Sequence, residues 1–239
     1  MTSITTQDYS IHFNDNAYKA LNEHLKTSNY SKIFLLADEN TNAHCVPFFL
    51  ANINADIAYE VFEIESGEDQ KNLDICLGLW EGLSEYGADR KSLLINIGGG
   101  VITDLGGFVA STFKRGISFI NVPTSLLGMV DASIGGKNGI DLGHIKNQIG
   151  VINAGEMVII DTEFLSTLPE NQMRSGLAEM FKHGLISSKD YWSKLKNLAN
   201  LSLDDLNTLI YESIIIKKDI VAQDPNEVNE RKTLNFGHT

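Results

Sequence analysis

Short apolar runs alternate with segments of helical period from the beginning of the chain to about residue 165. Runs such as 93–97 are apolar on both faces, as parallel strands covered by helices on both sides must be. Five runs have the length and residue types of strands, at 32–36, 58–64, 92–97, 117–122 and 157–160. Four segments have helical period, at 41–52, 68–86, 101–114 and 124–133. The alternation predicts an α/β domain with a mostly parallel, doubly wound sheet.

The pattern changes after Pro169, where no further strand is predicted. Residues 169–188, 190–200 and 203–223 all have helical period. Asp224 ends the last of these helices, because it precedes a proline and is disfavoured in helical geometry. We therefore expect an α/β domain over 1–167 and the first part of an all-helical domain over 168–239.

Composition and charge exclude several classes of protein. The 239 residues are 43% hydrophobic, which is too high for a disordered chain, and no apolar run approaches the roughly 20 residues that span a bilayer. Residues 1–6 resemble no signal peptide, and the net charge of −12 argues against binding to a phosphate backbone. Cys45 and Cys76 form no metal or redox motif. We expect a cytoplasmic protein with no nucleic-acid or membrane partner.

Twelve of the 20 glycines lie between Gly98 and Gly150. The segment GGGVITD at 98–104 follows a buried strand and opens a helix. Glycines at such a turn let a ligand approach the backbone, and the helix N-terminus offers N–H groups to an anion. Thr103 stands where the GxGxxG fingerprint has its last glycine, so a tight turn whose glycines only pack on the sheet remains an alternative.

The segment VPTSLLGMVDASIGGKNGID at 122–141 is denser in candidate residues. A loop with so many glycines has a high conformational entropy cost, which favours a function over a mere connection. Thr124 and Ser125 follow a strand and, taken alone, could be N-caps. The candidates here and just beyond are Thr124, Ser125, Asp131, Lys137, Lys146 and Asn147.

Polar residues with helical spacing interrupt the apolar helix predicted after Pro169. Glu179, Lys182 and His183 lie at i, i+3 and i+4 and share one face. Such a Glu–Lys pair is usually a surface ion pair, but burial in an apolar helix would be costly and suggests a function. Glu179 and His183 also have metal-ligand spacing, although one such pair is weak evidence. Farther on, Lys217 and His238 could be ordinary polar residues when each is taken alone.

Together these segments resemble the 3-dehydroquinate synthase family. The matching blocks are GGGVITDLGGFVAS, VPTSLLGMVDASIGGKNGID, the Lys-Asn pair before Gln148, SGLAEMFKHGLI and R-x-x-LNFGHT. They occur in the order and spacing of the family, from about residue 30 to the last residue. Five long blocks in register are far more specific than any single one.

The resemblance implies that the α/β domain binds NAD. The expected cofactor residues are Asp38, Asn40, Ser66, Gly67, Glu68, Asp69, Gln70, Lys71, Gly99, Gly100, Val101, Ile102, Thr103, Asp104, Thr124, Ser125, Phe164, Leu165, Ser166 and Thr167. Asp131, Lys137 and Lys146 are expected where the cofactor and substrate meet.

The resemblance also implies a catalytic zinc, or cobalt, bound by Glu179 and His238. His183 is not a ligand in the family, so the Glu179–His183 pair is not predicted to bind the metal. The substrate residues implied are Asp131, Lys137, Asn147, Lys182, Lys217, Arg231 and Asn235. Arg115 corresponds to an arginine that reaches across the dimer interface, which implies a homodimer.

The activity implied is that of a lyase, which converts 3-deoxy-D-arabino-heptulosonate 7-phosphate to 3-dehydroquinate and phosphate. This is the second step of the shikimate pathway, toward chorismate and aromatic amino acids, and NAD is not consumed. A substrate with a carboxylate and a phosphate would explain the many cations. The alternatives are another sugar-phosphate cyclase, an NAD-dependent polyol dehydrogenase of the same superfamily, and a non-catalytic NAD-binding protein.

A catalytic zinc usually has three protein ligands, and the resemblance supplies only two in this chain. In the family the third is a histidine downstream of the GHT motif. We therefore expect residues 1–239 by themselves to bind zinc weakly and to be inactive.

Overall fold

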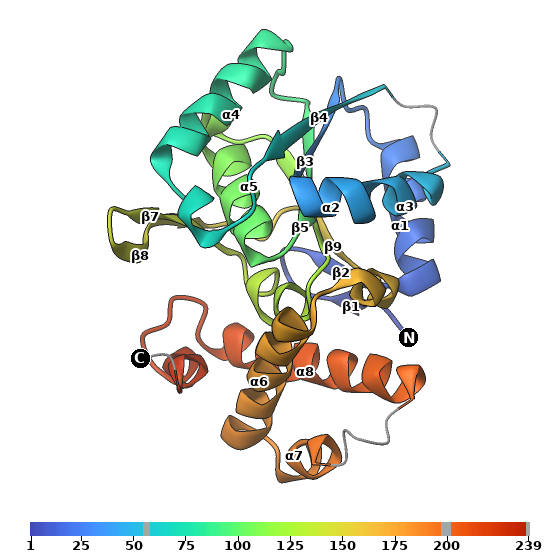
Figure 1. The fold of residues 1–239 in the computed structure, drawn as a ribbon, viewed down its shortest axis with the longest axis vertical. Helices are drawn as coiled ribbons and strands as arrows, with labels where there is room; N and C mark the ends of the chain where they lie inside the picture. Colours follow the sequence, from blue (N-terminus) through green and yellow to red (C-terminus); the bar gives the residue numbers. More distant parts are fainter. Residues whose placement is uncertain (55–57, 197–201, 238–239) are drawn as a thin grey trace.

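The computed structural model describes residues 1–54, 58–196 and 202–237, and a seven-stranded sheet lies at its centre (Figure 1). The strand order across the sheet is β1-β2-β9-β6-β5-β3-β4. β1 is antiparallel to β2, and the other pairings in this sheet are parallel. The strands are β1 (Ile4–Thr5), β2 (Ser10–Phe13), β3 (Ile33–Asp38), β4 (Tyr59–Ile64), β5 (Leu93–Gly98), β6 (Ser118–Pro123) and β9 (Met157–Ile160).

The inner strands are buried because alternate side chains enter two hydrophobic clusters, one on each face of the sheet. In β3, Phe34 and Leu36 belong to one cluster, and Ile33 and Leu35 belong to the other. The first cluster is covered by α4 (Leu73–Glu85) and α5 (Gly100–Thr112), and the second by α1 (Asn14–Thr27) and α3 (Val46–Ala51) (Figure 1). This arrangement confirms the predicted doubly wound, mostly parallel sheet.

The order of the strands reverses between β3 and β5. The chain moves outward from β3 to β4, and it then returns to the other side of β3 to form β5 and, beyond it, β6. In open α/β sheets, ligands bind at the carboxyl ends of the strands beside such a reversal. Asp38 ends β3 and Gly98 ends β5, so two of the predicted cofactor segments begin at this point.

The structure adds an antiparallel hairpin where the sequence predicted only a glycine turn. It consists of β7 (Lys137–Leu142) and β8 (Ile145–Ile152), and it packs on α5. Gly139 and Gly150 are cross-strand partners, and a Cβ on Gly150 would lie 2.4 Å from the carbonyl oxygen of Asn138. The glycines therefore permit close pairing of the strands. Because β8 is largely exposed, it lacks the apolar pattern by which strands are predicted.

Other elements also differ from the prediction. β1, β2 and α1 were not predicted, although the spacing of Ala17, Leu21 and Leu25 on the buried face of α1 indicates a helix. The predicted helix 41–52 is two helices, α2 (Glu39–His44) and α3, because Pro47 occupies the first turn of a new helix. The predicted helix 124–133 contains the π-helical turn η3 (Gly128–Ala132).

After Pro169 the described residues form helices joined by turns and contain no strand, as predicted. Met180, Leu209 and Ile214 of this part join the same hydrophobic cluster as Leu126 and other residues that follow the sheet. The core is thus continuous, and the boundary at residue 167 stays a prediction. The helices are α6 (Glu170–Ile186), α7 (Lys189–Leu195) and α8 (Leu203–Gln223), and the short turns are η1 (Glu68–Gln70), η2 (Phe113–Arg115), η4 (Thr162–Thr167) and η6 (Glu230–Asn235).

A search of the described residues for membrane-spanning helices found none of sufficient length and hydrophobicity.

Candidate active site

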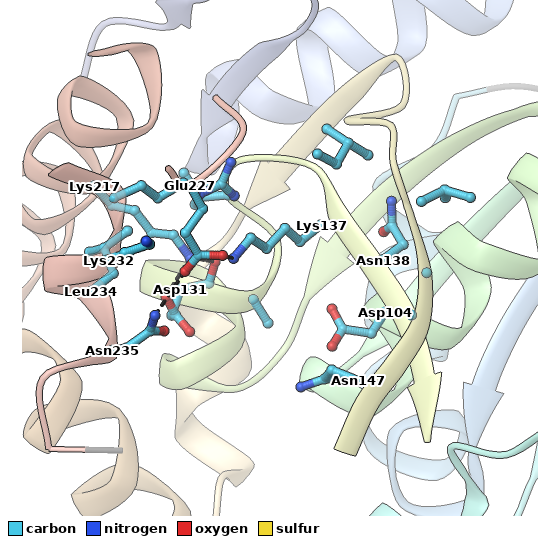
Figure 2. A pocket seen from close by; sticks show the side chains of 17 residues that line it. Asp104, Asp131, Lys137, Asn138, Asn147, Lys217, Glu227, Lys232, Leu234 and Asn235 are labelled. Atoms are coloured by element: carbon cyan, nitrogen blue, oxygen red, sulfur yellow. Dashed lines mark hydrogen bonds and ion pairs between the residues drawn. The ribbon is translucent and has the colours of Figure 1, made fainter. Parts of the chain in front are cut away.

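A cavity of about 880 Å³ lies between the β7–β8 hairpin and the helical part of the chain (Figure 2). Lys137 reaches it from the hairpin, and Lys217 and Asn235 reach it from α8 and η6 (Figure 2). The predicted substrate residues that line this cavity are Asp131, Lys137, Asn147, Lys217, Arg231 and Asn235. The fold therefore brings together six residues that are up to 104 positions apart in the sequence.

Buried Lys217 forms an ion pair with the partly buried Asp131 at the wall of the cavity. The turn η3 presents Asp131, and the Lys217 ammonium donates to its carbonyl oxygen at 2.6 Å and pairs with its carboxylate. Burial alone would raise the pKa of Asp131, but Lys217, followed by Lys182 and His183, holds it well below its usual range. Asp131 is therefore an ionised carboxylate with a cation beside it.

A second buried group lies on α6, where Glu179, Lys182 and His183 share one face as predicted. The Lys182 ammonium pairs with Glu179 Oε1 and donates to the carbonyl oxygen of Leu234 at 2.5 Å. The ligand atoms of Asp131, Glu179 and His183 all lie within 4.8 Å of one another. Carboxylate oxygens are donors that suit zinc, so the chemistry of Glu179 fits its predicted role as a ligand of a divalent metal. His238, the other predicted metal ligand, lies outside the described residues.

Glu227 is a residue of the cavity that the sequence did not single out. It pairs with Lys137, and its Oε1 accepts a hydrogen bond from Asn235 Nδ2 at 2.9 Å. Burial would raise the pKa of Glu227, but Lys137 and Asn235 hold it below its usual value. Its backbone φ is +57°, a left-handed conformation that is uncommon outside glycine. No motif surrounds it, so no signal in the sequence predicted its contact with Lys137.

Arg231 enters the cavity from a tightly built turn. The Asp224 carboxylate accepts hydrogen bonds from the backbone N–H groups of Val228, Asn229 and Arg231. The Arg231 guanidinium donates to the carbonyl oxygens of Pro225 at 2.7 Å and Gly135 at 3.1 Å. These contacts hold the buried Arg231 at the cavity. Among the described residues, no carboxylate forms a direct ion pair with its guanidinium.

The predicted NAD-binding segments gather at the carboxyl edge of the sheet. The backbone N–H of Thr124 donates to the Gly98 carbonyl at 2.9 Å, which joins the ends of β5 and β6. Gly99 is the N-cap of α5, so no side chain caps this helix. A Cβ at Gly100 would lie 3.2 Å from Ala132 Cβ. This close-packed turn and uncapped helix start fit the pyrophosphate of a dinucleotide.

Lys71 and Asp104 join the segment 66–71 to this edge. Their ion pair measures 2.8 Å, and the Lys71 carbonyl accepts the backbone N–H of Asp141 in the hairpin. Burial raises the pKa of Asp104 to about 6, although Lys71 opposes the rise. Asp104 also lines the cavity, so the predicted cofactor edge and the substrate cavity are contiguous. Nearby, Lys146 pairs with Glu68 at 3.4 Å.

The remaining predicted residues lie away from the cavity. Asp38 caps α2 through a hydrogen bond from the Thr41 backbone N–H at 2.8 Å. Phe164 and Leu165 of η4 are buried in the hydrophobic core after β9. Arg115 is exposed in η2, which follows the last turn of α5 and does not line the cavity. Its predicted contact with a second subunit stays a prediction, as do the cofactor roles.

Comparison with known proteins places the chain in a family. The 3-dehydroquinate synthase N-terminal model matches residues 61–175, and the C-terminal model matches residues 176–239. A 3-dehydroquinate synthase of Parabacteroides distasonis is 43% identical over 221 residues, which are 92% of this chain and 62% of that protein. One of Leptospira interrogans is 36% identical over 233 residues, which are 96% of this chain and 64% of that protein. The chain thus spans less than two thirds of these relatives.

Solved structures share the fold at lower identity. A 2-deoxy-scyllo-inosose synthase complexed with carbaglucose-6-phosphate, NAD+ and Co2+ has a TM-score of 0.87 at 24% identity, covering 99% of this chain and 68% of that one. A 2-epi-5-epi-valiolone synthase from Streptomyces hygroscopicus with NAD+ and Zn2+ has a TM-score of 0.83 at 21% identity, covering 100% and 68%. The two family models together match residues 61–239, which is more than half of the chain. With the 3-dehydroquinate synthases that are 36–43% identical, they show that the chain belongs to the 3-dehydroquinate synthase family.

Proposed function

We propose that this chain provides the NAD-binding edge and most of the substrate cavity of a 3-dehydroquinate synthase. The reaction would convert 3-deoxy-D-arabino-heptulosonate 7-phosphate to 3-dehydroquinate and phosphate. The observation that carries the proposal is the cavity itself, which six predicted substrate residues line together. Lys137, Lys217 and Arg231 among them supply positive charge for a substrate with a carboxylate and a phosphate.

Gly99 to Asp104 with Lys71 would hold NAD, and Glu179 with His238 would hold the metal. When bound, the two groups would supply a hydride acceptor and a Lewis acid for the substrate hydroxyls. The ionised Asp131 accepts hydrogen bonds from substrate hydroxyls. Lys217, its ion-pair partner, donates hydrogen bonds to substrate oxygens. Lys137 and Glu227 form a donor and an acceptor at the hairpin side. The walls exclude water and orient the substrate between these pairs.

The wider setting follows from the same proposal. Exposed Arg115 would reach the cavity of a partner subunit in a homodimer, and the protein would act in the cytoplasm. We keep as a prediction that residues 1–239 alone bind zinc weakly and do not turn over, because the third metal ligand of the family is expected elsewhere.

A lysine substitution tests the proposal in the full-length protein. Lys217→Met removes the buried cation that pairs with Asp131, whereas Lys218→Met removes its neighbour on α8, which pairs with Asp219 at 2.6 Å. We expect Lys217→Met to slow phosphate release from the heptulosonate phosphate at least about 100-fold, and Lys218→Met to leave it unchanged. Equal rates for the two variants would contradict the proposal. Stoichiometric NADH without phosphate release would instead indicate a polyol dehydrogenase.

A further inference from the structure

His183 is a fully buried histidine to which neither the sequence motifs nor the proposed reaction assigns a role. It lies on α6 one turn after Glu179, and its Nδ1 is 2.7 Å from the Ser213 hydroxyl on α8. Ser213 is itself fully buried. This contact fixes the imidazole ring across the interface between two helices. A buried ring held so firmly has its second nitrogen, Nε2, aimed in a fixed direction.

That direction is toward the Glu179 carboxylate. Nε2 lies 3.4 Å from Glu179 Oε1, and in the described part of the chain it has no hydrogen-bond partner. Leaving a buried polar atom unsatisfied typically costs about 1–3 kcal/mol. A small shift of the carboxylate would satisfy Nε2, and metal binding at Glu179 is an event that would fix the carboxylate in place.

The contacts of Glu179 Oε1 argue against His183 as a metal ligand in its own right. The Lys182 ammonium pairs with the same oxygen and is held there by the Leu234 carbonyl. A metal between Oε1 and His183 Nε2 would therefore lie beside the buried Lys182 ammonium. Two neighbouring cations in a medium of low dielectric constant repel each other strongly. A metal bound to Glu179 is better placed on Oε2.

We propose that His183 is a positioning residue for the metal ligand Glu179, an inference that rests on the proposed function. The Ser213 hydroxyl donates to Nδ1, which places the imidazole proton on Nε2. Nε2–H then donates to Glu179 Oε1, and together with Lys182 it turns Oε2 toward the metal. Partners of this kind commonly change metal affinity about 10- to 100-fold when removed. The pair Ser213–His183 thus connects α8 to the metal through hydrogen bonds.

Zinc affinity of the full-length protein, measured by competition with a chelator, tests this role. His183→Met keeps the volume and removes the donor, and we expect it to weaken zinc binding about 10- to 100-fold. His183→Gln retains an N–H donor and should stay within about threefold of the wild type. Ser213→Ala removes the hydrogen bond to Nδ1, and its zinc affinity should lie between those of the two His183 variants. Ser188→Ala is the matched control, since it removes the N-cap of α7 without contact to Glu179.

The outcomes separate this inference from the proposed function. Wild-type affinity in a folded His183→Met protein overturns the positioning role alone, and so does wild-type affinity in Ser213→Ala if the methionine variant does not fold. A drop beyond about 1,000-fold in His183→Gln, with a changed absorption spectrum of the Co2+-substituted protein, would make His183 a ligand and overturn the role as well. A wild-type protein that binds no zinc contradicts the proposed function and the inference together.

Discussion

Two aspartates that line the cavity, each paired with a buried lysine, show how the surroundings of a carboxyl group set its pKa. Asp131 pairs with Lys217 and has a pKa well below its usual range, whereas Asp104 pairs with Lys71 and has a pKa near 6. Burial opposes ionisation in both. Asp131 has additional cations nearby, but Asp104 is also raised by the charge of Asp131. Lys71, its ion-pair partner, is thus the main group that opposes this rise in the pKa of Asp104.

Lys71→Met should therefore destabilise the fold in a pH-dependent way. Without Lys71 the pKa of Asp104 rises further above its unfolded value of about 3.9. At pH values between the unfolded and the folded pKa of Asp104, the folded state binds more protons than the unfolded state. The free energy of unfolding therefore falls as pH rises through this range. We expect a loss of about 3 kcal/mol at about pH 8 and a clearly smaller loss at about pH 5, measured by urea denaturation.

Lys146→Met provides the matched control for that measurement. Lys146 is 68% exposed and pairs with Glu68 at 3.4 Å, a surface contact that contributes little to stability. Its substitution should leave the free energy of unfolding nearly unchanged at both pH values. A pH-independent loss in Lys71→Met would show that Asp104 does not titrate as described.

Helix α5 approaches the sheet and the hairpin through two adjacent glycines. A Cβ on Gly106 would lie 1.9 Å from Asn96 Oδ1, and a Cβ on Gly107 would lie 2.0 Å from Asn138 Oδ1. Asn96 Nδ2 donates to Asn121 Oδ1 at 2.8 Å, and Asn138 Nδ2 donates to the carbonyl oxygens of Gly136 and Asn153. The glycines thus let the helix rest on amides that hold two strands and the base of the hairpin.

Gly106→Ala should lower the free energy of unfolding, whereas alanine at a helical glycine with open space around it should raise it. Gly→Ala inside a helix ordinarily stabilises by about 0.5–1 kcal/mol. Gly78 in α4 has open space around it, so Gly78→Ala should show that gain. Gly106→Ala must displace Asn96 and should lose about 1–3 kcal/mol by denaturation. Gains of equal size in both variants would contradict the close approach of α5.

The strands and helices that were predicted correctly are those with a clear local hydrophobic pattern. The strands β3, β5 and β6 are apolar on both faces and were predicted within a residue or two of their bounds. The β7–β8 hairpin was missed because glycines and exposed residues replace that pattern. The α6 face of Glu179, Lys182 and His183 followed from helical spacing. Glu227 and Ser213 acquire their contacts only through tertiary packing, which no local pattern reveals.

The hydrophobic core joins the sheet and the helices into one unit. Leu126 and Met129, which follow β6, belong to the same buried cluster as Met180 of α6 and Ile214 of α8. Residues that share one core lose each other's contacts when either part unfolds. Glu179 on α6, the predicted metal ligand, and the predicted cofactor edge of the sheet are therefore held by the same packing.

The two tryptophans test this continuity, because the chain has one in each part. Trp80 lies on α4 against α5, and Trp192 lies on α7. The Trp80→Phe and Trp192→Phe proteins each keep one fluorescent reporter. In each protein we expect the urea midpoint from tryptophan fluorescence to equal the midpoint from circular dichroism. Fluorescence from one reporter that changes well before the other would show that the parts unfold separately.

The central claim for the whole molecule is that its cavity runs a synthase reaction in which NAD is returned unchanged. The most direct measurement is the amount of phosphate released per NAD when the full-length protein, with Zn2+, receives the heptulosonate phosphate in large excess over NAD. We predict many phosphates released for each NAD and no net NADH. Phosphate release that stops at one per NAD, or NADH that accumulates in step with substrate loss, would contradict the claim.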